Sequence, residues 1–263
     1  MYSIEKFLKW YKTKFVKKPI SVMIITIVAI LTGINTVFDT ASHVVSLGHS
    51  TINLFTDKYK EDYQKLNEIR TGMNADYVGK LFGPPSISRK HEYLKGYFER
   101  LYVKDQFFLY LVTNEDNSIK YYSVTQRMND FNPYFPIEIA GRKKQLGKTK
   151  LVELNNNSPE FVMADMSSKF ISYTETNYYG NSGLYKYYQF GYAPAGITQI
   201  SDQQNSDIHY LVDNIDPIVL HRFRQTYIPN SFSVIDEEVE EDFFNYYKES
   251  MIGIDYFEAR GYN

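Results

Sequence analysis

Twenty consecutive residues without a charge, PISVMIITIVAILTGINTVF at 19–38, constrain this 263-residue chain more than any other feature. As a helix rising 1.5 Å per residue they would span about 30 Å, the hydrocarbon thickness of a bilayer. The alternatives are a buried core helix, which the lack of any polar face disfavours, and a cleaved signal peptide, which usually has a shorter apolar region of about 7–15 residues. We therefore predict a retained single-pass transmembrane helix, whose membrane residues include Ile20, Val22, Ile24, Ile27, Leu31 and Asn35.

The charges on either side of this segment predict its orientation. Residues 1–18 hold six Lys and one Glu, whereas the chain after residue 38 holds 23 Lys and Arg against 30 Asp and Glu. Because cytoplasmic flanks carry an excess of Lys and Arg, we expect the N-terminus in the cytoplasm of a bacterium and the C-terminal domain on the outer side of its inner membrane. The acidic balance of that domain argues against a nucleic-acid partner, because such binders present a basic surface.

The aromatic content predicts a sheet in the part after this segment. The chain holds 25 Tyr and 18 Phe, residues that favour strands. In TGMNADYVGKLFGPP (71–85), Asn74 can cap a short helix, Gly83 suits the left-handed position after it, and Pro84 prevents its continuation. Strand-like stretches with turns between them come next and predict a three-stranded antiparallel meander over 95–103, 106–113 and 119–126.

This succession, with LNEIRTGMNADYVGKLFGPP ahead of the meander, resembles the SmpA/OmlA (BamE) type of envelope module. The spacing from Gly72 to Pro84 recurs from Gly147 to Pro159, before further strand-like stretches, and predicts a second, divergent module. A tandem pair of such modules is similar to the β-lactamase inhibitor protein, which implies a continuous sheet with helices behind it and a partner on its concave face. Members of the module family are usually lipoproteins, whereas this chain has no Cys to carry a lipid.

The second half, with SYTETNYYGNSGLYKYYQFGYAPAGI and FRQTYIPNSFSVI, also resembles a bacterial family of single-pass membrane proteins. We predict an α+β fold, in which an N-terminal transmembrane helix precedes two helix-helix-β-meander modules that form an antiparallel, Tyr-rich sheet. The predicted parts are a basic cytoplasmic arm (1–18), the transmembrane helix (19–38), a juxtamembrane helical linker (39–65), a first module (66–130), a second module (131–201) and a C-terminal covering segment (202–263).

No catalytic motif fits the chain. G-x-S-x-G, G-x-G-x-x-G and H-E-x-x-H are missing, and the lack of Cys excludes disulfides and thiolate metal ligands. The densest polar stretch could place His209 and Asp213 on one helix face, but Pro217 interrupts it. We therefore expect no enzyme activity, no cofactor and no metal site, and we interpret this stretch as a polar surface that contains Asp207, His209, Asp213, Asp216 and His221.

Tyrosine is the remaining candidate for function. Strand alternation over 184–192 places Tyr185 and Tyr187 on one face and Tyr188, Phe190 and Tyr192 on the other. One face packs on helices, and the other either displays tyrosine, which is enriched in binding hot spots, or is covered by the last sixty residues. The candidate partner-binding residues are Tyr110, Tyr122, Tyr185, Tyr187, Tyr188 and Tyr192.

The predicted function is therefore that of a non-enzymatic, membrane-anchored protein-interaction module of the bacterial envelope. Its expected partners are the lipid bilayer and either another protein or a second copy of the chain. The alternative is a membrane-bound sensor or effector of the stress or anti-phage type, in which a ligand of the C-terminal domain acts through an oligomerising transmembrane helix. Small and polar residues within that helix could mediate such association: Thr32, Gly33, Asn35 and Thr36.

Overall fold

The computed structural model describes residues 58–139, 142–155, 157–180, 185–197 and 200–262. By its contacts the chain divides into two compact units, Met1–Lys60 and Glu61–Asn263, and nearly all of the described residues belong to the second. The predicted basic arm, the predicted transmembrane segment at 19–38 and most of the predicted linker lie outside the described residues. None of the helices in the described part is both long enough and apolar enough to cross a membrane.

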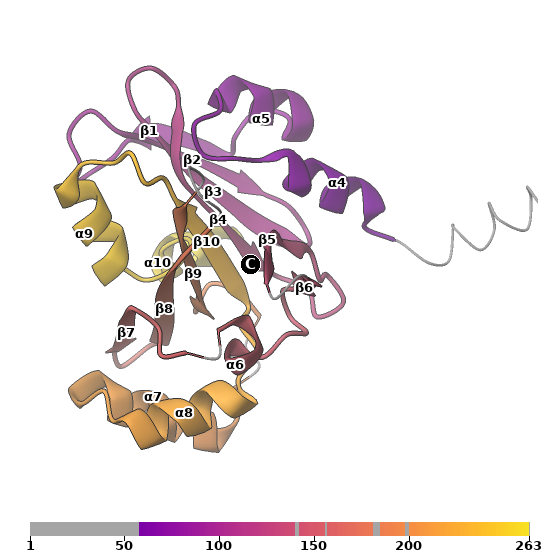
Figure 1. Ribbon diagram of the computed structural model, residues 1–263. Coiled ribbons are helices and arrows are strands. Elements are labelled where there is room, and N and C mark those ends of the chain that lie inside the picture. The colour runs from indigo at the N-terminus through magenta and orange to yellow at the C-terminus, as the bar shows by residue number, and fades with distance from the viewer. Residues whose placement is uncertain (1–57, 140–141, 156, 181–184, 198–199, 263) are drawn as a thin grey trace, which may run out of the picture. The chain divides into compact units, whose positions relative to one another are not determined.

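One eight-stranded sheet organises the second unit (Figure 1), and every neighbouring pair of strands in it is antiparallel. The strand order is β1-β2-β3-β4-β10-β9-β8-β7, so the last strand in sequence lies in the middle. Two further strands, β5 (Tyr134–Ile139) and β6 (Arg142–Gln145), pair with each other. The strands of the large sheet are β1 (Ile87–Lys90), β2 (Phe98–Val103), β3 (Phe107–Thr113), β4 (Ile119–Gln126), β7 (Phe161–Met166), β8 (Ile171–Tyr179), β9 (Lys186–Tyr192) and β10 (Ser231–Ile235).

Helices α4 (Lys60–Glu68) and α5 (Ala75–Phe82) belong to one face of the sheet. The predicted helix in TGMNADYVGKLFGPP is confirmed as α5, because the Asn74 side chain accepts a hydrogen bond from the Asp76 amide and Gly83 has a φ of 82°. Phe82 packs edge-on against Phe107 of β3, with ring centroids 5.9 Å apart.

Residues paired across neighbouring strands point to the same face of the sheet. On this face the paired residues are, in strand order, Leu109, Val124, Phe232, Phe190 and Glu175. On the second half of the sheet this face is covered by α6 (Leu151–Leu154), α7 (Asp202–Asp213) and α8 (Pro217–Thr226). Ser201 caps α7, Asp216 caps α8, and Pro217 occupies the first turn of α8, where its missing N–H has no cost. Phe223 of α8 then packs against Tyr173 of β8, with ring centroids 4.6 Å apart.

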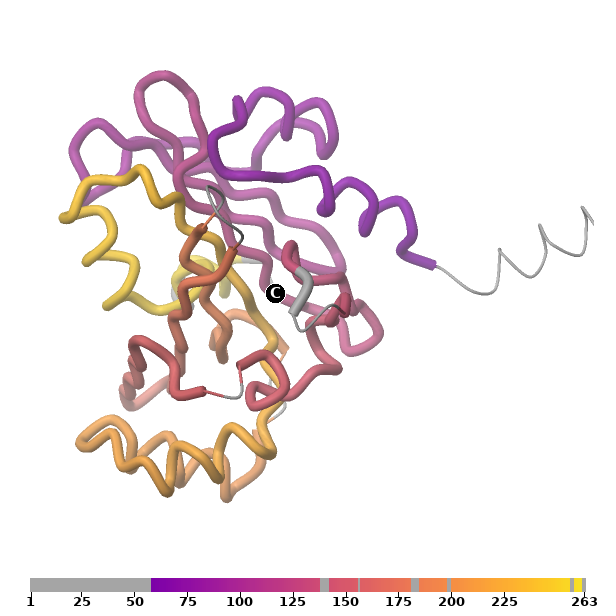
Figure 2. Tube along the Cα trace, viewed as in Figure 1, coloured from indigo at the N-terminus to yellow at the C-terminus, as the bar shows by residue number. Residues whose placement is uncertain are grey.

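The opposite face carries the C-terminal helices α9 (Glu241–Glu249) and α10 (Tyr256–Ala259), followed by the 3₁₀-helix η1 (Arg260–Tyr262). Tyr247 of α9 stacks on Tyr121 of β4, with ring centroids 4.1 Å apart. Figure 2 shows the yellow C-terminal segment beside the violet loop between β1 and β2, although 156 residues separate His91 in that loop from Tyr247.

The predicted fold class is therefore wrong in its architecture. The first meander is confirmed as β2, β3 and β4, but the predicted second meander ended in a strand at 197–201, where the structure describes none among Ile197, Ile200 and Ser201. The third strand next to β8 and β9 is instead β10, which pairs with both β4 and β9. It comes from the segment that was predicted only to cover the sheet. The described residues thus form neither two separate three-stranded modules nor a tandem repeat, and they contain no membrane-spanning helix.

Candidate functional site

A cavity of about 600 Å³ lies on the α9 face of the sheet. Its walls come from distant parts of the fold, because Arg89 lies on β1, Asp165 lies on β7, and these are the two edge strands. For both edges to line one cavity, the sheet must curve around it. The segment from Glu249 to Glu258 supplies the remaining wall, so the C-terminal part of the chain completes the cavity.

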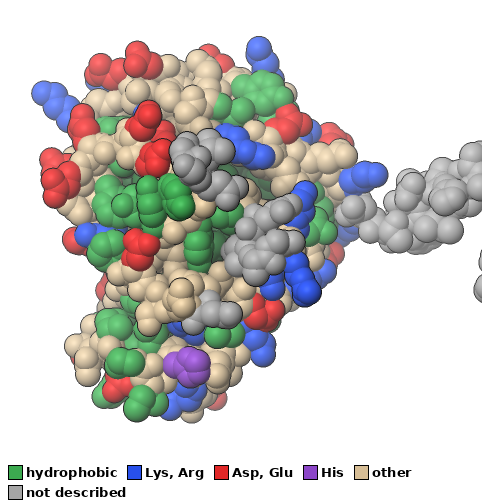
Figure 3. Space-filling view, in the orientation of Figure 1, with side chains coloured by type: hydrophobic (Ala, Val, Ile, Leu, Met, Phe, Trp, Pro, Cys, Tyr) green, Lys and Arg blue, Asp and Glu red, His purple; other side chains and the backbone are tan. Residues whose placement is uncertain are grey.

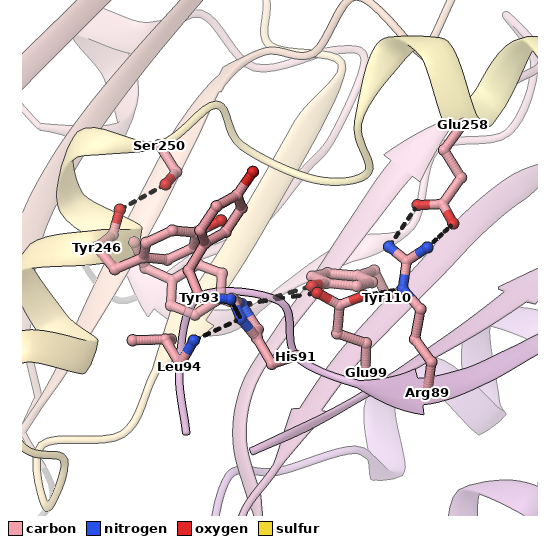
Figure 4. Close-up of polar contacts among 10 residues, drawn as sticks. Arg89, His91, Tyr93, Leu94, Glu99, Tyr110, Tyr246, Ser250 and Glu258 are labelled. Carbon is pink, nitrogen blue, oxygen red and sulfur yellow. Dashed lines mark hydrogen bonds and ion pairs between the residues drawn. The ribbon is translucent and has the colours of Figure 1, made fainter. Parts of the chain in front are cut away.

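The lining is strongly acidic. Arg89 is the one basic side chain among the described lining residues, and it bridges two of the carboxylates (Figure 4). Its Nε lies 2.6 Å from Glu99 Oε2, and its Nη1 lies 3.0 Å from Glu258 Oε1. Burial raises the pKa of Glu258, and the neighbouring Glu99 and Asp255 carboxylates raise it further, against the effect of Arg89. The six acidic lining residues are Glu92, Glu99, Asp165, Glu249, Asp255 and Glu258.

His91 lies beneath this lining with a defined proton position. Its Nδ1 accepts hydrogen bonds from the backbone amides of Tyr93, at 3.1 Å, and Leu94, at 3.0 Å, so the neutral ring carries its proton on Nε2. Burial, followed by the Arg89 charge, lowers the pKa of His91, although Glu99 opposes this. At neutral pH His91 is therefore an uncharged donor, and its Nε2 lies 3.0 Å from the Tyr247 hydroxyl.

The His91 proton orients a short chain of hydroxyls. Tyr247 accepts from His91 and can therefore direct its own proton to the Tyr110 hydroxyl, 3.4 Å away at the cavity wall. Burial raises the pKa of both tyrosines well above 10. Since neither phenol ionises near neutral pH and burial lowers the pKa of His91, this chain is suited to holding a hydrogen-bonding group in a set direction rather than to exchanging protons.

Aromatic rings form the outer wall of the cavity. Tyr93 stacks on Tyr246, with ring centroids 5.9 Å apart and an interplanar angle of 29°. His91 meets Tyr246 edge-on at 5.0 Å, which fixes the inner ring of this stack. Tyr93 is 69% exposed, so the outer ring of the stack is open to solvent at the mouth of the cavity.

On the other side of α9, aromatic side chains from three strands and the helix form an exposed cluster, which we call the aromatic surface. Tyr178 stacks on Tyr185 at 5.1 Å and contacts Tyr187 at 4.7 Å. Tyr187 packs on Phe244 at 4.2 Å, and Lys248 Nζ lies 4.5 Å from the centre of the Phe161 ring. Figure 3 shows hydrophobic side chains gathered beside α9 in this view. The aromatic surface consists of Phe161, Tyr178, Tyr185, Tyr187 and Phe244.

The six tyrosines predicted to bind a partner separate into three groups. Tyr122, Tyr188 and Tyr192 are buried, at 2%, 7% and 5% exposure, and cannot contact a partner in this fold. Tyr110 lines the cavity, and Tyr185 and Tyr187 belong to the aromatic surface. The prediction missed Phe161, Tyr178 and Phe244 of that surface, and every acidic and histidine residue of the cavity, because no local spacing brings them together.

Two carboxylates of the predicted polar surface have structural partners. Asp207 pairs with Arg222, and Asp216 caps α8 through its carboxylate. Among the described residues no group of three or more His, Asp or Glu side chains converges closely enough to hold a metal ion, and this includes the acidic lining of the cavity. The lining carboxylates come from both edges of the sheet, and three of them, Glu99, Asp255 and Glu258, are near enough for the charges of the first two to raise the pKa of Glu258.

Comparisons with known proteins add little to this geometry. No protein-family model and no curated protein matches the chain. Among solved structures, a cysteine-rich secretory protein from Staphylococcus aureus is similar at 14% identity over 64% of this chain, with a TM-score of 0.33. The alignment spans 44% of that protein, and a likeness this distant carries no argument about fold or function. The resemblance to the SmpA/OmlA type of module is not tested by it and stays a prediction.

Proposed function

We propose that the folded part of this chain is a protein-interaction module that binds a protein partner through the aromatic surface. The observation that carries the proposal is the exposure of clustered rings, since Phe161, Tyr178 and Tyr185 are 40%, 39% and 38% exposed. Clustered exposed aromatics mark interaction sites on soluble folds, whereas single exposed ones do not. Tyrosine in particular supplies a large contact area with few torsions to immobilise.

The packing of the aromatic surface supports its use as a preformed site. Tyr187 and Phe244 lie beneath the outer rings and join β9 to α9, so the exposed rings rest on a rigid base. Lys248 Nζ lies 4.5 Å from the Phe161 ring centre and 5.6 Å from that of Phe244, which adds a positive charge at the rim. The Tyr178 hydroxyl donates to Glu237 at 3.4 Å, so one edge carries polar groups as well. An apolar centre with a polar rim is the common anatomy of a protein interface.

A photo-cross-linking amino acid at position 185, in cells that produce the protein, tests this proposal. We expect a discrete protein adduct there, and its loss in the Phe161→Ser/Tyr178→Ser background. The matched control places the same amino acid at Tyr210, which is 51% exposed on α7 on the opposite face. An adduct of twice the 30.9 kDa chain would identify the partner as a second copy. Equal adducts at 185 and 210, or none at 185, would contradict the proposal.

A further inference from the structure

The acidic cavity is separate from the aromatic surface and calls for a different ligand. We propose that it is a binding site for an organic cation that carries alkylammonium groups spaced along an aliphatic chain, as in a linear polyamine or a run of lysine side chains. The inference rests on three observations: the excess of carboxylates, their dispersal around the wall, and the aromatic mouth. It goes beyond the proposed function and does not depend on it.

The excess of negative charge calls for a cation. Glu99 and Glu258 share the single guanidinium of Arg89, and four further carboxylates line the same cavity, of which Glu249 lies 3.9 Å from Lys248 Nζ outside the lining. At one wall Glu99 and Asp255 repel the Glu258 carboxylate, which adds to the effect of burial in raising the pKa of Glu258. A bound cation would relieve the repulsion, whereas an anion would add to it.

The dispersal of the carboxylates selects an extended cation over a single ion. Metal ions need several oxygens at bonding distance from one point, and no such convergence occurs among the described residues. Asp165 on β7 and Glu92 after β1 instead belong to opposite edges of the sheet while lining one cavity of about 600 Å³. That volume falls in the range of small-molecule sites. A chain with a charge at each end matches carboxylates on opposite walls.

The aromatic mouth supports the same class of ligand. Tyr93 and Tyr246 present ring surface to the cavity, and a ring face attracts ammonium groups while also packing against methylene groups. The Tyr110 hydroxyl, oriented by Tyr247 and His91, adds a neutral acceptor or donor inside the cavity. Carboxylates, ring faces and a positioned hydroxyl together suit a ligand that alternates ammonium groups with alkyl spacers.

Calorimetric titration of the whole purified chain with the triamine spermidine tests the inference. We expect saturable binding that weakens with added salt. The Glu92→Gln/Asp165→Asn variant, which removes a charge from each wall without changing shape, should bind about tenfold more weakly. The Glu115→Gln/Asp213→Asn variant makes the same change in net charge at exposed positions outside the cavity and should bind as the wild type does.

A second variant tests spermidine binding without changing the net charge of the protein. Tyr93→Leu leaves every carboxylate in place and removes one ring face, so we expect about a threefold loss of spermidine affinity. Titration with trilysine separates two sources of the same chemistry, since tighter binding than spermidine would point to lysine side chains of a protein and weaker binding to a free polyamine.

Three outcomes would overturn the inference: no saturable binding of either probe, equal effects of the cavity variant and its surface control, or unchanged affinity in Glu92→Gln/Asp165→Asn. The Phe161→Ser/Tyr178→Ser variant should bind spermidine normally. Failure of this site and failure of the aromatic surface are therefore distinguishable in the same set of proteins.

Discussion

Two glutamate–arginine pairs lie on opposite faces of the sheet and have opposite surroundings. Arg224 Nε lies 2.8 Å from Glu175 Oε1, with side chains 4% and 1% exposed, among the helices that pack on β8. Arg89 Nε lies 2.6 Å from Glu99 Oε2; here the Glu99 side chain is 9% exposed, but the Arg89 side chain is 51% exposed and both residues line the acidic cavity. Similar distances thus occur in a pair that is buried on both sides and in a pair whose arginine reaches solvent, and we call the second the open pair.

The two ion pairs also differ in their hydrogen-bond partners. Around the buried pair, Tyr173 donates to Glu175 at 2.6 Å, and Arg224 donates to the carbonyls of Asn157, at 3.0 Å, and Asn155. Burial nevertheless raises the pKa of Glu175, so desolvation outweighs the partners that favour the charged form. These contacts join β8 to α8 and to the chain before β7. We interpret the buried pair as structural.

The largest predicted effect comes from breaking the buried pair. Arg224→Met should lower the free energy of unfolding by about 3–5 kcal/mol, because it leaves the Glu175 carboxylate buried without a cation. Urea unfolding of the purified chain measures this. The control is Glu175→Gln/Arg224→Met, which removes both charges and should recover most of the loss. If Arg224→Met lowered the free energy of unfolding by less than about 1 kcal/mol, this pair would behave as an ordinary surface ion pair, and the two pairs would not differ as we interpret them.

An intermediate effect with a pH signature is expected at His91. His91→Phe removes the acceptor for the Tyr93 and Leu94 amides and should cost about 1–3 kcal/mol at about pH 7.5. The pKa of His91 is lowered by folding, so the unfolded chain binds the proton first as the pH falls below 6.5. The wild type therefore loses stability as the pH falls from that value through the folded-state pKa, and the variant does not.

Urea unfolding at about pH 7.5 and about pH 5.5 measures this difference. The gap in unfolding free energy between wild type and His91→Phe should narrow at the lower pH. A gap that stays constant or widens would show that His91 is not held neutral by its surroundings, and would remove the basis for the oriented chain from His91 to Tyr110.

The smallest effect on stability is expected at the open pair. Arg89→Met should cost about 1 kcal/mol, because Arg89 itself is half exposed, although the Glu99 and Glu258 side chains that lose it are only 9% and 19% exposed. The same change removes the one basic side chain of the described lining and should tighten spermidine binding severalfold. A loss of stability equal to that of Arg224→Met would show that solvent does not reach the cavity wall.

The candidate site was less predictable from sequence than the strands around it. The strand alternation of 184–192 is confirmed, since Tyr188, Phe190 and Tyr192 are buried on one face and Tyr187 packs on α9 from the other. The pattern could not tell which of these faces would be covered, because α9 begins 49 residues after β9 ends (241 − 192). No sequence pattern predicted the cavity, because each lining residue looks ordinary in its own segment; Glu99, for example, is a single charged residue within a strand.

The sequence by itself determined the local elements. The cap at Asn74, the positive φ of Gly83 and the strands β2, β3 and β4 depend on residue types acting on their own neighbourhood, so they could be predicted. Only the tertiary structure decided where β10 pairs, which tyrosines are buried and which acids share a cavity. Strand pairing and burial depend on contacts between residues far apart in the chain, and periodicity within one segment carries no information about which distant segment will cover it.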